Sequence, residues 1–181
     1  MRITAGIHRS RRLESLNGDH TRPTSDKLKE AIFSSIGPFF DGGKMLDVFG
    51  GSGSIALEAI SRGMKSATII ENNRAAIQVI KRNVVQLKEV KKVKILNGSY
   101  QSVLKHITNE SFDLIYIDPP YAMDVYEEIL LFLVKEGMIH TNSIVICESN
   151  QMVNLKEQYG ILKKQKEKNY RSTKITIFKG E

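Results

Sequence analysis

The sequence predicts an α/β fold: a seven-stranded, mostly parallel sheet with helices on both faces and an antiparallel hairpin at its C-terminal edge. Short apolar runs alternate with amphipathic stretches from residue 45 onward, which is the pattern of repeated strand–helix units. Glycine-containing turns separate several of these units. Residues 159–177 change to alternating polar and apolar positions, which predicts paired antiparallel strands.

A small hairpin and a helix are expected ahead of this core. Residues 2–7 and 11–16 can form two short strands around a tight turn. Thr24 or Ser25 can cap a helix that ends near Gly37, because apolar residues recur on one helical face between them. This part of the chain therefore predicts a hairpin-plus-helix extension.

The core elements follow in strict alternation. Strands are expected at 45–49, 67–71, 93–96, 112–118 and 143–148. Helices are expected from the glycine turn through Arg62 and at 73–88, 100–107 and 126–136. The chain is thus predicted to be one domain over 1–181, with an extension at 1–40 and a core at 44–181.

Composition excludes several classes of protein. No apolar run is long enough to span a membrane, and the first residues lack the apolar stretch of a signal peptide. Cys147 is the only cysteine and lies in an apolar run, so we expect a core residue, no internal disulfide and a cytoplasmic protein. The four histidines show no ligand spacing, and no metal is expected. The net charge of +7, with arginines near the start and lysines near the end, indicates a polyanionic partner.

A glycine loop joins the first core strand to its helix and predicts a ligand site. Gly50-Gly51-Ser52-Gly53 follows Asp47 and Phe49, and Glu71 ends the next strand. Glycines let a ligand approach the backbone, and the carboxylate of Glu71 can accept hydrogen bonds from both hydroxyls of a ribose. The loop also fits a relaxed dinucleotide fingerprint, so a nicotinamide enzyme is an alternative.

Three features favour a methyl donor over a nicotinamide at this loop, and the first is the Asp118-Pro119-Pro120-Tyr121 turn after the fourth strand, which a dehydrogenase does not need. Asp47 lies where a pyrophosphate would sit, and a carboxylate there suits an amine-bearing ligand. S-adenosylmethionine carries a sulfonium, an ammonium and a ribose but no phosphate. The chain also lacks a second domain large enough to hold a hydride acceptor.

Asp118-Pro119-Pro120-Tyr121 follows the fourth core strand and predicts a clamp for the amine of a flat base. The prolines restrict the backbone at and before their own positions. The Asp118 carboxylate and the Pro119 carbonyl are then two rigid acceptors, and Tyr121 adds an aromatic face. A plain turn that only ends the strand is the alternative.

Taken together, these residues resemble the class I, Rossmann-like S-adenosylmethionine-dependent methyltransferases that modify exocyclic amines. The chain is more closely similar to the bacterial 16S ribosomal RNA guanine-N2 methyltransferase family, almost from end to end. The similar segments are Arg2-Ile3-x-Ala5-Gly6, Arg22-Pro23-Thr24, Leu57-Glu58-Ala59-x-Ser61-Arg62-Gly63 and Glu148-Ser149.

The resemblance implies the following roles. The methionine end of the cofactor would be bound by Asp47, Phe49, Gly50, Gly51, Ser52 and Gly53. Glu71 would bind the ribose, and Asn72, Ser99 and Tyr100 would border the adenine. Asp118, Pro119, Pro120 and Tyr121 would form the catalytic turn, and S-adenosylhomocysteine would be the product.

The N-terminal extension is expected to contact RNA. Arg9, Arg11, Arg12 and Arg22 can bind phosphates, and Thr24 belongs to the same expected surface. The resemblance implies 16S rRNA within an assembling small subunit as the partner, and we expect a monomer. The alternatives are an adenine-N6 methyltransferase acting on RNA or DNA, and an RNA-binding protein that has lost catalysis.

Overall fold

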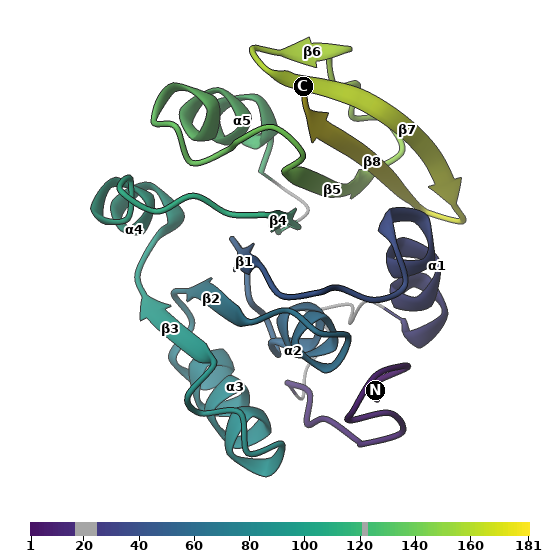
Figure 1. Ribbon diagram of the computed structural model, residues 1–181, viewed down its shortest axis with the longest axis vertical. Coiled ribbons are helices and arrows are strands. Elements are labelled where there is room, and N and C mark those ends of the chain that lie inside the picture. The colour runs from purple at the N-terminus through teal and green to yellow at the C-terminus, as the bar shows by residue number, and fades with distance from the viewer. Residues whose placement is uncertain (17–24, 121–122) are drawn as a thin grey trace.

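A mixed sheet of eight strands runs through the protein, as seen in the computed structural model, which describes residues 1–16, 25–120 and 123–181 (Figure 1). The strands of the described residues are β1 Lys44–Asp47, β2 Ser66–Glu71, β3 Val93–Asn97, β4 Leu114–Ile117, β5 Ile144–Asn150, β6 Gln158–Tyr159, β7 Leu162–Tyr170 and β8 Thr173–Gly180. Their order in the sheet is β3-β2-β1-β4-β5-β8-β7-β6. The first five are parallel, and the last three pair antiparallel.

Five helices cover the two faces of the sheet (Figure 1). Within the described ranges they are α1 Asp26–Ile36, α2 Ser54–Ser61, α3 Arg74–Gln86, α4 Tyr100–His106 and α5 Tyr126–Lys135. Apolar residues of α1, α2 and α3 form one core cluster with one face, and those of α4 and α5 form a second with the other. The predicted α/β fold is therefore confirmed, as is the capping of the first helix by Ser25.

The sheet differs from the prediction in its C-terminal part. One strand was expected over 159–166, but Gly160 adopts a positive φ of 55° and turns the chain between β6 and β7. The positive φ places the turn in the left-handed region, which glycine adopts without strain. The described strands therefore number eight instead of seven.

The N-terminal hairpin is also less regular than expected. Its two arms share the hydrogen bonds Ile3 N to Arg11 O (2.9 Å) and Leu13 N to Met1 O (3.0 Å), yet only an isolated bridge, Arg2 with Arg12, is regular. The pairing ends at Ile3, whose carbonyl accepts from the Ser10 amide at 2.9 Å, and the outward-facing amide of the next residue, Thr4, donates to the carboxylate of a buried helix residue.

That buried residue, Glu58 on α2, fastens the hairpin to the core. Its carboxylate accepts from the Thr4 amide (2.9 Å), the Thr4 hydroxyl (2.7 Å) and the Ala5 amide (3.1 Å). Arg62 Nε lies 2.8 Å from the same carboxylate, and Lys29 Nζ of α1 lies 3.5 Å from it. The segment Leu57–Gly63, one of the segments of family resemblance, thus joins the extension to the core.

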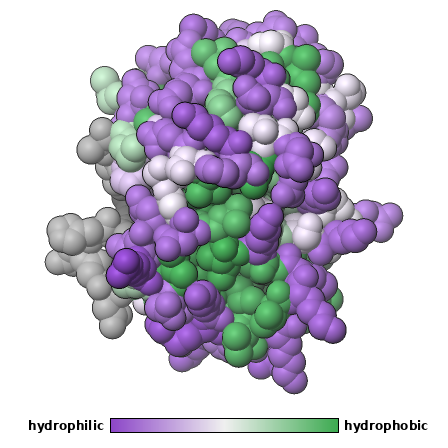
Figure 2. Space-filling model, turned by 90° about the vertical axis from the view of Figure 1, so that its left-hand side faces the viewer, coloured by the Kyte–Doolittle hydropathy of each residue, from purple (hydrophilic) through white to green (hydrophobic). Residues whose placement is uncertain are grey.

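The β3 edge of the sheet is short and half-exposed. Figure 2 shows apolar surface on the side of the molecule where α4 and β3 lie. Val93, Ile95 and Leu96 are partly buried there, and the neighbouring lysines Lys92 and Lys94 are charged. Charged residues at an exposed strand edge discourage pairing with another chain. In the part of the chain that is described, no helix is long and apolar enough to cross a membrane.

Candidate active site

Four acids stand at one edge of the sheet, where parallel strands end. Asp47 ends β1, Glu71 ends β2, Asp118 follows β4, and Glu148 lies near the end of β5. Because these strands are parallel neighbours in the order β2-β1-β4-β5, their carboxyl ends lie side by side. Ligands bind at this edge of open α/β sheets. The structure therefore brings together the three acids that the sequence singled out.

The glycine loop forms a close turn between β1 and α2. Gly51 and Gly53 have positive φ angles of 55° and 76°, and Gly53 caps α2 in the left-handed conformation. A Cβ on Gly50 would come within 2.3 Å of Ile69, whereas a Cβ on Gly51 would meet no atom within 4 Å. Gly50 therefore packs against the sheet, and Gly51 borders open space that a ligand can occupy.

Asp47 is buried and incompletely satisfied. Its Oδ1 atom has no hydrogen-bond partner within the described residues. Burial, with a contribution from the negative charge of Glu71, raises the pKa of Asp47 to about 7, against the opposing backbone bonds of Phe49 and Ala56. A buried acid with an orphaned oxygen fits a ligand that brings an amine or a positive charge.

Glu71, in contrast to Asp47, accepts hydrogen bonds on both of its carboxylate oxygens. Its carboxylate accepts from the backbone amides of Gly51 (2.8 Å), Asn72 (2.9 Å) and Asn73 (2.8 Å). An ionised carboxylate offers about four acceptor positions, so further hydroxyl groups can still bind. Asn73 in turn caps α3, and its neighbour Asn72 is exposed.

Ser99 and Tyr100 lie at the start of α4 and have partners within the protein. The Ser99 hydroxyl caps α4 by accepting from the Ser102 amide at 3.3 Å. The Tyr100 ring is buried against Phe49, with centroids 5.4 Å apart, and its hydroxyl donates to Glu128 at 3.3 Å. In this structure the Tyr100 ring packs against Phe49. A direct contact of Ser99 or Tyr100 with adenine stays a prediction.

The Asp118 turn borders a small hollow that opens to solvent. Asp118 is half-buried, Pro119 is buried and Pro120 is exposed, while Tyr121 lies outside the described residues. Burial, then the negative charges of Glu148 and Asp47, raises the pKa of Asp118 well above its ordinary value. The remaining residues that line the hollow are Met123, Tyr126, Glu148, Ser149, Asn150, Val153 and Thr173.

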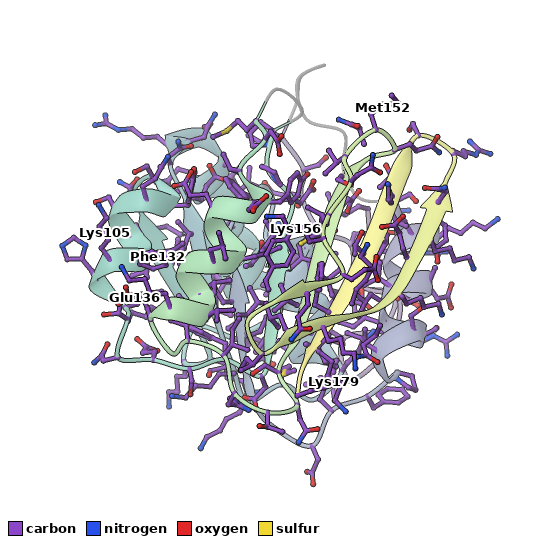
Figure 3. The ribbon with its side chains drawn as sticks, turned by 90° about the horizontal axis from the view of Figure 1, so that it is seen from above. Lys105, Phe132, Glu136, Met152, Lys156 and Lys179 are labelled. Carbon is purple, nitrogen blue, oxygen red and sulfur yellow. The ribbon has the colours of Figure 1, made fainter. Side chains whose placement is uncertain are left out.

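Figure 3 shows the loop that follows β5. Met152, in the loop after β5, is at one end of the sheet, and Lys179, near the end of the antiparallel β8, is toward the other. Val153 of the same loop lines the hollow. The residues of β5 and of this loop were not among the predicted site residues. The signal that could have found them was Glu148-Ser149, which the sequence marked only as a point of family resemblance.

The predicted RNA-contacting arginines lie apart from the hollow. Arg9, Arg11 and Arg12 are exposed, while Arg22 and Thr24 fall outside the described residues. The Arg12 carbonyl accepts from Gln86 at the C-terminal end of α3 (2.9 Å). This helix begins just after Glu71, so the described arginines lie near its opposite end.

The N-terminal hairpin also touches the glycine loop through one buried side chain. Asn83 of α3 donates to the carbonyls of Glu14 and Ser52, both at 3.0 Å, and accepts from the Glu14 amide at 2.8 Å. Asn83 is fully buried. The extension and the loop are therefore fixed to a common anchor.

The strand order and the loops at the carboxyl edge define a class I, Rossmann-like methyltransferase fold. The solved structure of the yhhF protein of Escherichia coli has this fold, with a TM-score of 0.85 and 28% sequence identity, over 100% of this chain and 98% of that one. The chain belongs to the family described as conserved hypothetical protein 95, which matches residues 1–179.

Two curated relatives are similar over most of their length. The YlbH protein of Bacillus subtilis is 33% identical over 181 residues, which cover 99% of this chain and 98% of that protein. "Ribosomal RNA small subunit methyltransferase D" of Haemophilus influenzae is 32% identical over 153 residues, which cover 83% of this chain and 79% of that protein.

Proposed function

We propose that this protein transfers a methyl group from S-adenosylmethionine to the exocyclic N2 amine of a guanine in 16S rRNA. The observation that carries the proposal is the placement of the Asp118 turn beside a hollow at the same sheet edge as Asp47 and Glu71. A methyl donor and an amine acceptor can meet at such an edge. The name of the Haemophilus influenzae relative supports ribosomal RNA as the substrate.

The donor side fits S-adenosylmethionine in shape and charge. Gly51 borders open space, and the orphaned oxygen of Asp47 is suited to the amino group of the methionine portion. Glu71, oriented by three backbone amides, is placed to accept from the ribose hydroxyls. When bound, S-adenosylmethionine supplies an electrophilic methyl group, and no metal is needed for that transfer.

The acceptor side addresses the weak nucleophilicity of the amine. The lone pair of guanine N2 is delocalised into the ring, so the enzyme must orient the nitrogen and stabilise the charge that grows on it. The Asp118 carboxylate and the Pro119 carbonyl can each accept one N–H of that amine. The raised pKa of Asp118 makes its carboxylate a stronger base, suited to take the proton that the nitrogen loses.

The remaining turn residues and the extension would hold the RNA. Tyr121 would stack on the base, and Pro120 would keep the turn rigid. A base inside a helix cannot enter the hollow, so the target must be unpaired or flipped out. Arg9, Arg11, Arg12, Arg22 and Thr24 would bind the backbone of the RNA. The protein would act as a monomer on an assembling small subunit in the cytoplasm.

Methyl transfer from labelled S-adenosylmethionine tests the proposal. The protein is incubated with 30S particles lacking the modification and with naked 16S rRNA, and the labelled nucleoside is identified by digestion and mass spectrometry. We expect N2-methylguanosine at a single position. Label in N6-methyladenosine, or no label on either substrate, would contradict the proposal.

A further inference from the structure

Glu148 lies next to Asp118 across two neighbouring strands. The last paired residues of β4 and β5 are Ile117 and Cys147, so Asp118 and Glu148 follow at the next position of the register. Both side chains line the same hollow. The acid that is proposed to hold the amine therefore has a second acid beside it.

The carboxylate of Glu148 is buried and firmly positioned. Only 9% of the residue is exposed, and the hydroxyl of Tyr116 donates to its Oε2 atom. The hydroxyl of Tyr126, at the start of α5, donates to the Glu148 carbonyl at 2.7 Å. A carboxylate offers about four acceptor positions, so it can hold a bond from Tyr116 and accept from a ligand as well. Burying an acid is costly, and placing one against a substrate N–H recovers part of that cost.

The two purines differ in what they would present to this acid. In guanine the ring position beside the N2 amine is N1–H, a donor, whereas in adenine the ring position beside the amine is N1, an acceptor. We propose that Glu148 is a specificity-determining residue that accepts the N1–H of the target guanine while Asp118 accepts from its N2 amine. This inference rests on the proposed methylation of guanine N2.

The neighbouring Ser149 adds a second polar group to the same wall. It is 6% exposed, and its hydroxyl has no hydrogen-bond partner among the residues described. It lines the same hollow as Glu148. Guanine O6, which follows N1 around the ring, is an acceptor that such a hydroxyl can satisfy. Adenine would instead place the lone pair of N1 toward the carboxylate of Glu148, and the two would repel each other.

2-Aminopurine separates the reading of N1 from the methylation of N2. It keeps the 2-amino group but has an unprotonated N1 and no O6, so it is a methyl acceptor that offers no donor to Glu148 and no acceptor to Ser149. RNA carrying guanine or 2-aminopurine at the mapped target position is methylated under single-turnover conditions. The second-order rate constants at low RNA concentration are then compared. For the wild type we expect about a 100-fold preference for guanine, since a charged hydrogen bond to the substrate is lost. The same comparison in Ser149→Ala, where no O6 contact can be lost, isolates the contribution of N1.

Glu148→Gln changes the acceptor into a group that can also donate. The amide can meet an unprotonated N1, so we expect the preference for guanine to fall by at least about tenfold, with a slower rate on guanine and a faster one on 2-aminopurine; in Glu148→Gln combined with Ser149→Ala it should fall to within about threefold. Glu148→Asp keeps the charge and should keep the preference. Glu136→Gln, at the C-terminal end of α5 and outside the hollow, is the matched control and should leave both rates unchanged.

The outcomes separate this inference from the proposed function. Failure of the wild type to methylate guanine would remove the proposed function and this inference with it. Methylation of guanine and 2-aminopurine by the wild type at equal rates would overturn the role of Glu148 alone. Equal losses on both substrates in Glu148→Gln would show a structural role only, and they would likewise overturn it. Should Glu148→Gln fail to fold, the ratio in Ser149→Ala still decides the question: about a 100-fold preference for guanine supports the role of Glu148, and equal rates overturn it.

Discussion

At the scale of single residues, the acids of the site differ by what surrounds them. Glu71 is satisfied by three backbone amides, whereas one oxygen of Asp47 has no partner in the described structure. In the order of the strands, Asp118 lies between Asp47 and Glu148, and the negative charges of both help to raise its pKa. These different surroundings support the different roles proposed for the carboxylates: ribose binding, recognition of an ammonium group and proton acceptance.

The raised pKa of Asp47 predicts a pH dependence for cofactor binding. In the free protein this carboxyl is largely protonated below its pKa of about 7, and an ammonium group binds the ionised form. Binding must therefore release a proton below pH 7, so affinity for S-adenosylhomocysteine should fall about tenfold per pH unit there and level off above. Calorimetry from pH 5.5 to 8 measures this, and Asp47→Asn should flatten the profile. A flat profile in the wild type would contradict the assignment.

Asp118→Ala should separate binding from catalysis. The change removes one of two acceptors for the amine but leaves Asp47 and Glu71 in place, so single-turnover methylation should fall by about 100- to 1,000-fold or more. Calorimetry should show unchanged affinity for S-adenosylhomocysteine. Asp41→Ala, outside the site, is the control. Methylation at the wild-type rate by Asp118→Ala would refute the proposed mechanism.

At the scale of elements, the N-terminal hairpin is held by a charged network instead of a strand ladder. Arg62 donates from Nε to Glu58, from Nη1 to the Pro38 carbonyl (2.9 Å) and from Nη2 to the Thr4 hydroxyl (2.8 Å). Its guanidinium also lies 4.7 Å from the centre of the Phe33 ring. The close packing of Gly6, whose Cβ would fall 1.8 Å from the Ser61 carbonyl oxygen, completes the joint.

Loss of Glu58 should therefore release the extension. Glu58→Ala leaves Arg62 and Lys29 buried without their carboxylate, and we expect a loss of about 3–5 kcal/mol in the free energy of unfolding. Chemical denaturation measures this loss, and hydrogen exchange should show faster exchange at residues 3–13. Glu30→Ala, an exposed acid on α1, is the matched control. Unchanged protection of residues 3–13 would mean that the network does not anchor the hairpin.

At the scale of the whole molecule, the arginines proposed to bind RNA and the hollow proposed to receive the base lie apart. The hairpin with Arg9, Arg11 and Arg12 reaches the C-terminal end of α3, and the thirteen residues of that helix span about 20 Å. An RNA that contacts both the hairpin and the hollow must pass along the side of the protein where α3 lies. Phosphate contacts at the hairpin would then orient the RNA, while the hollow selects the base.

Replacing the three described arginines by glutamine should weaken RNA binding without changing the chemistry. We expect the slope of log affinity against log salt concentration to become shallower by about 2, because the counterions at the phosphates that are no longer contacted stay bound to the RNA. The rate at saturating RNA should stay within a few-fold of the wild type. Filter binding across salt concentrations measures the slope, with Lys105→Gln and Lys135→Gln as an exposed control pair. An unchanged slope would place the RNA elsewhere on the surface.

The amino-acid sequence alone predicts the alternation of strands and helices as far as β5, and it marks the acids Asp47, Glu71 and Asp118 at or beside the ends of three strands, although the bounds of β1 and β4 differ from the prediction by one or two residues. These are local properties: hydrophobic periodicity specifies the element, and glycine, proline and acidic residues specify its ends. Parallel strands then place Asp47, Glu71 and Asp118 at one edge. Which further residues join these acids follows from the packing of distant segments. Glu148 meets Asp118 through strand register, and Glu58 meets Thr4 across 54 positions of the chain. Such pairs depend on the packing of distant segments, which no local pattern encodes.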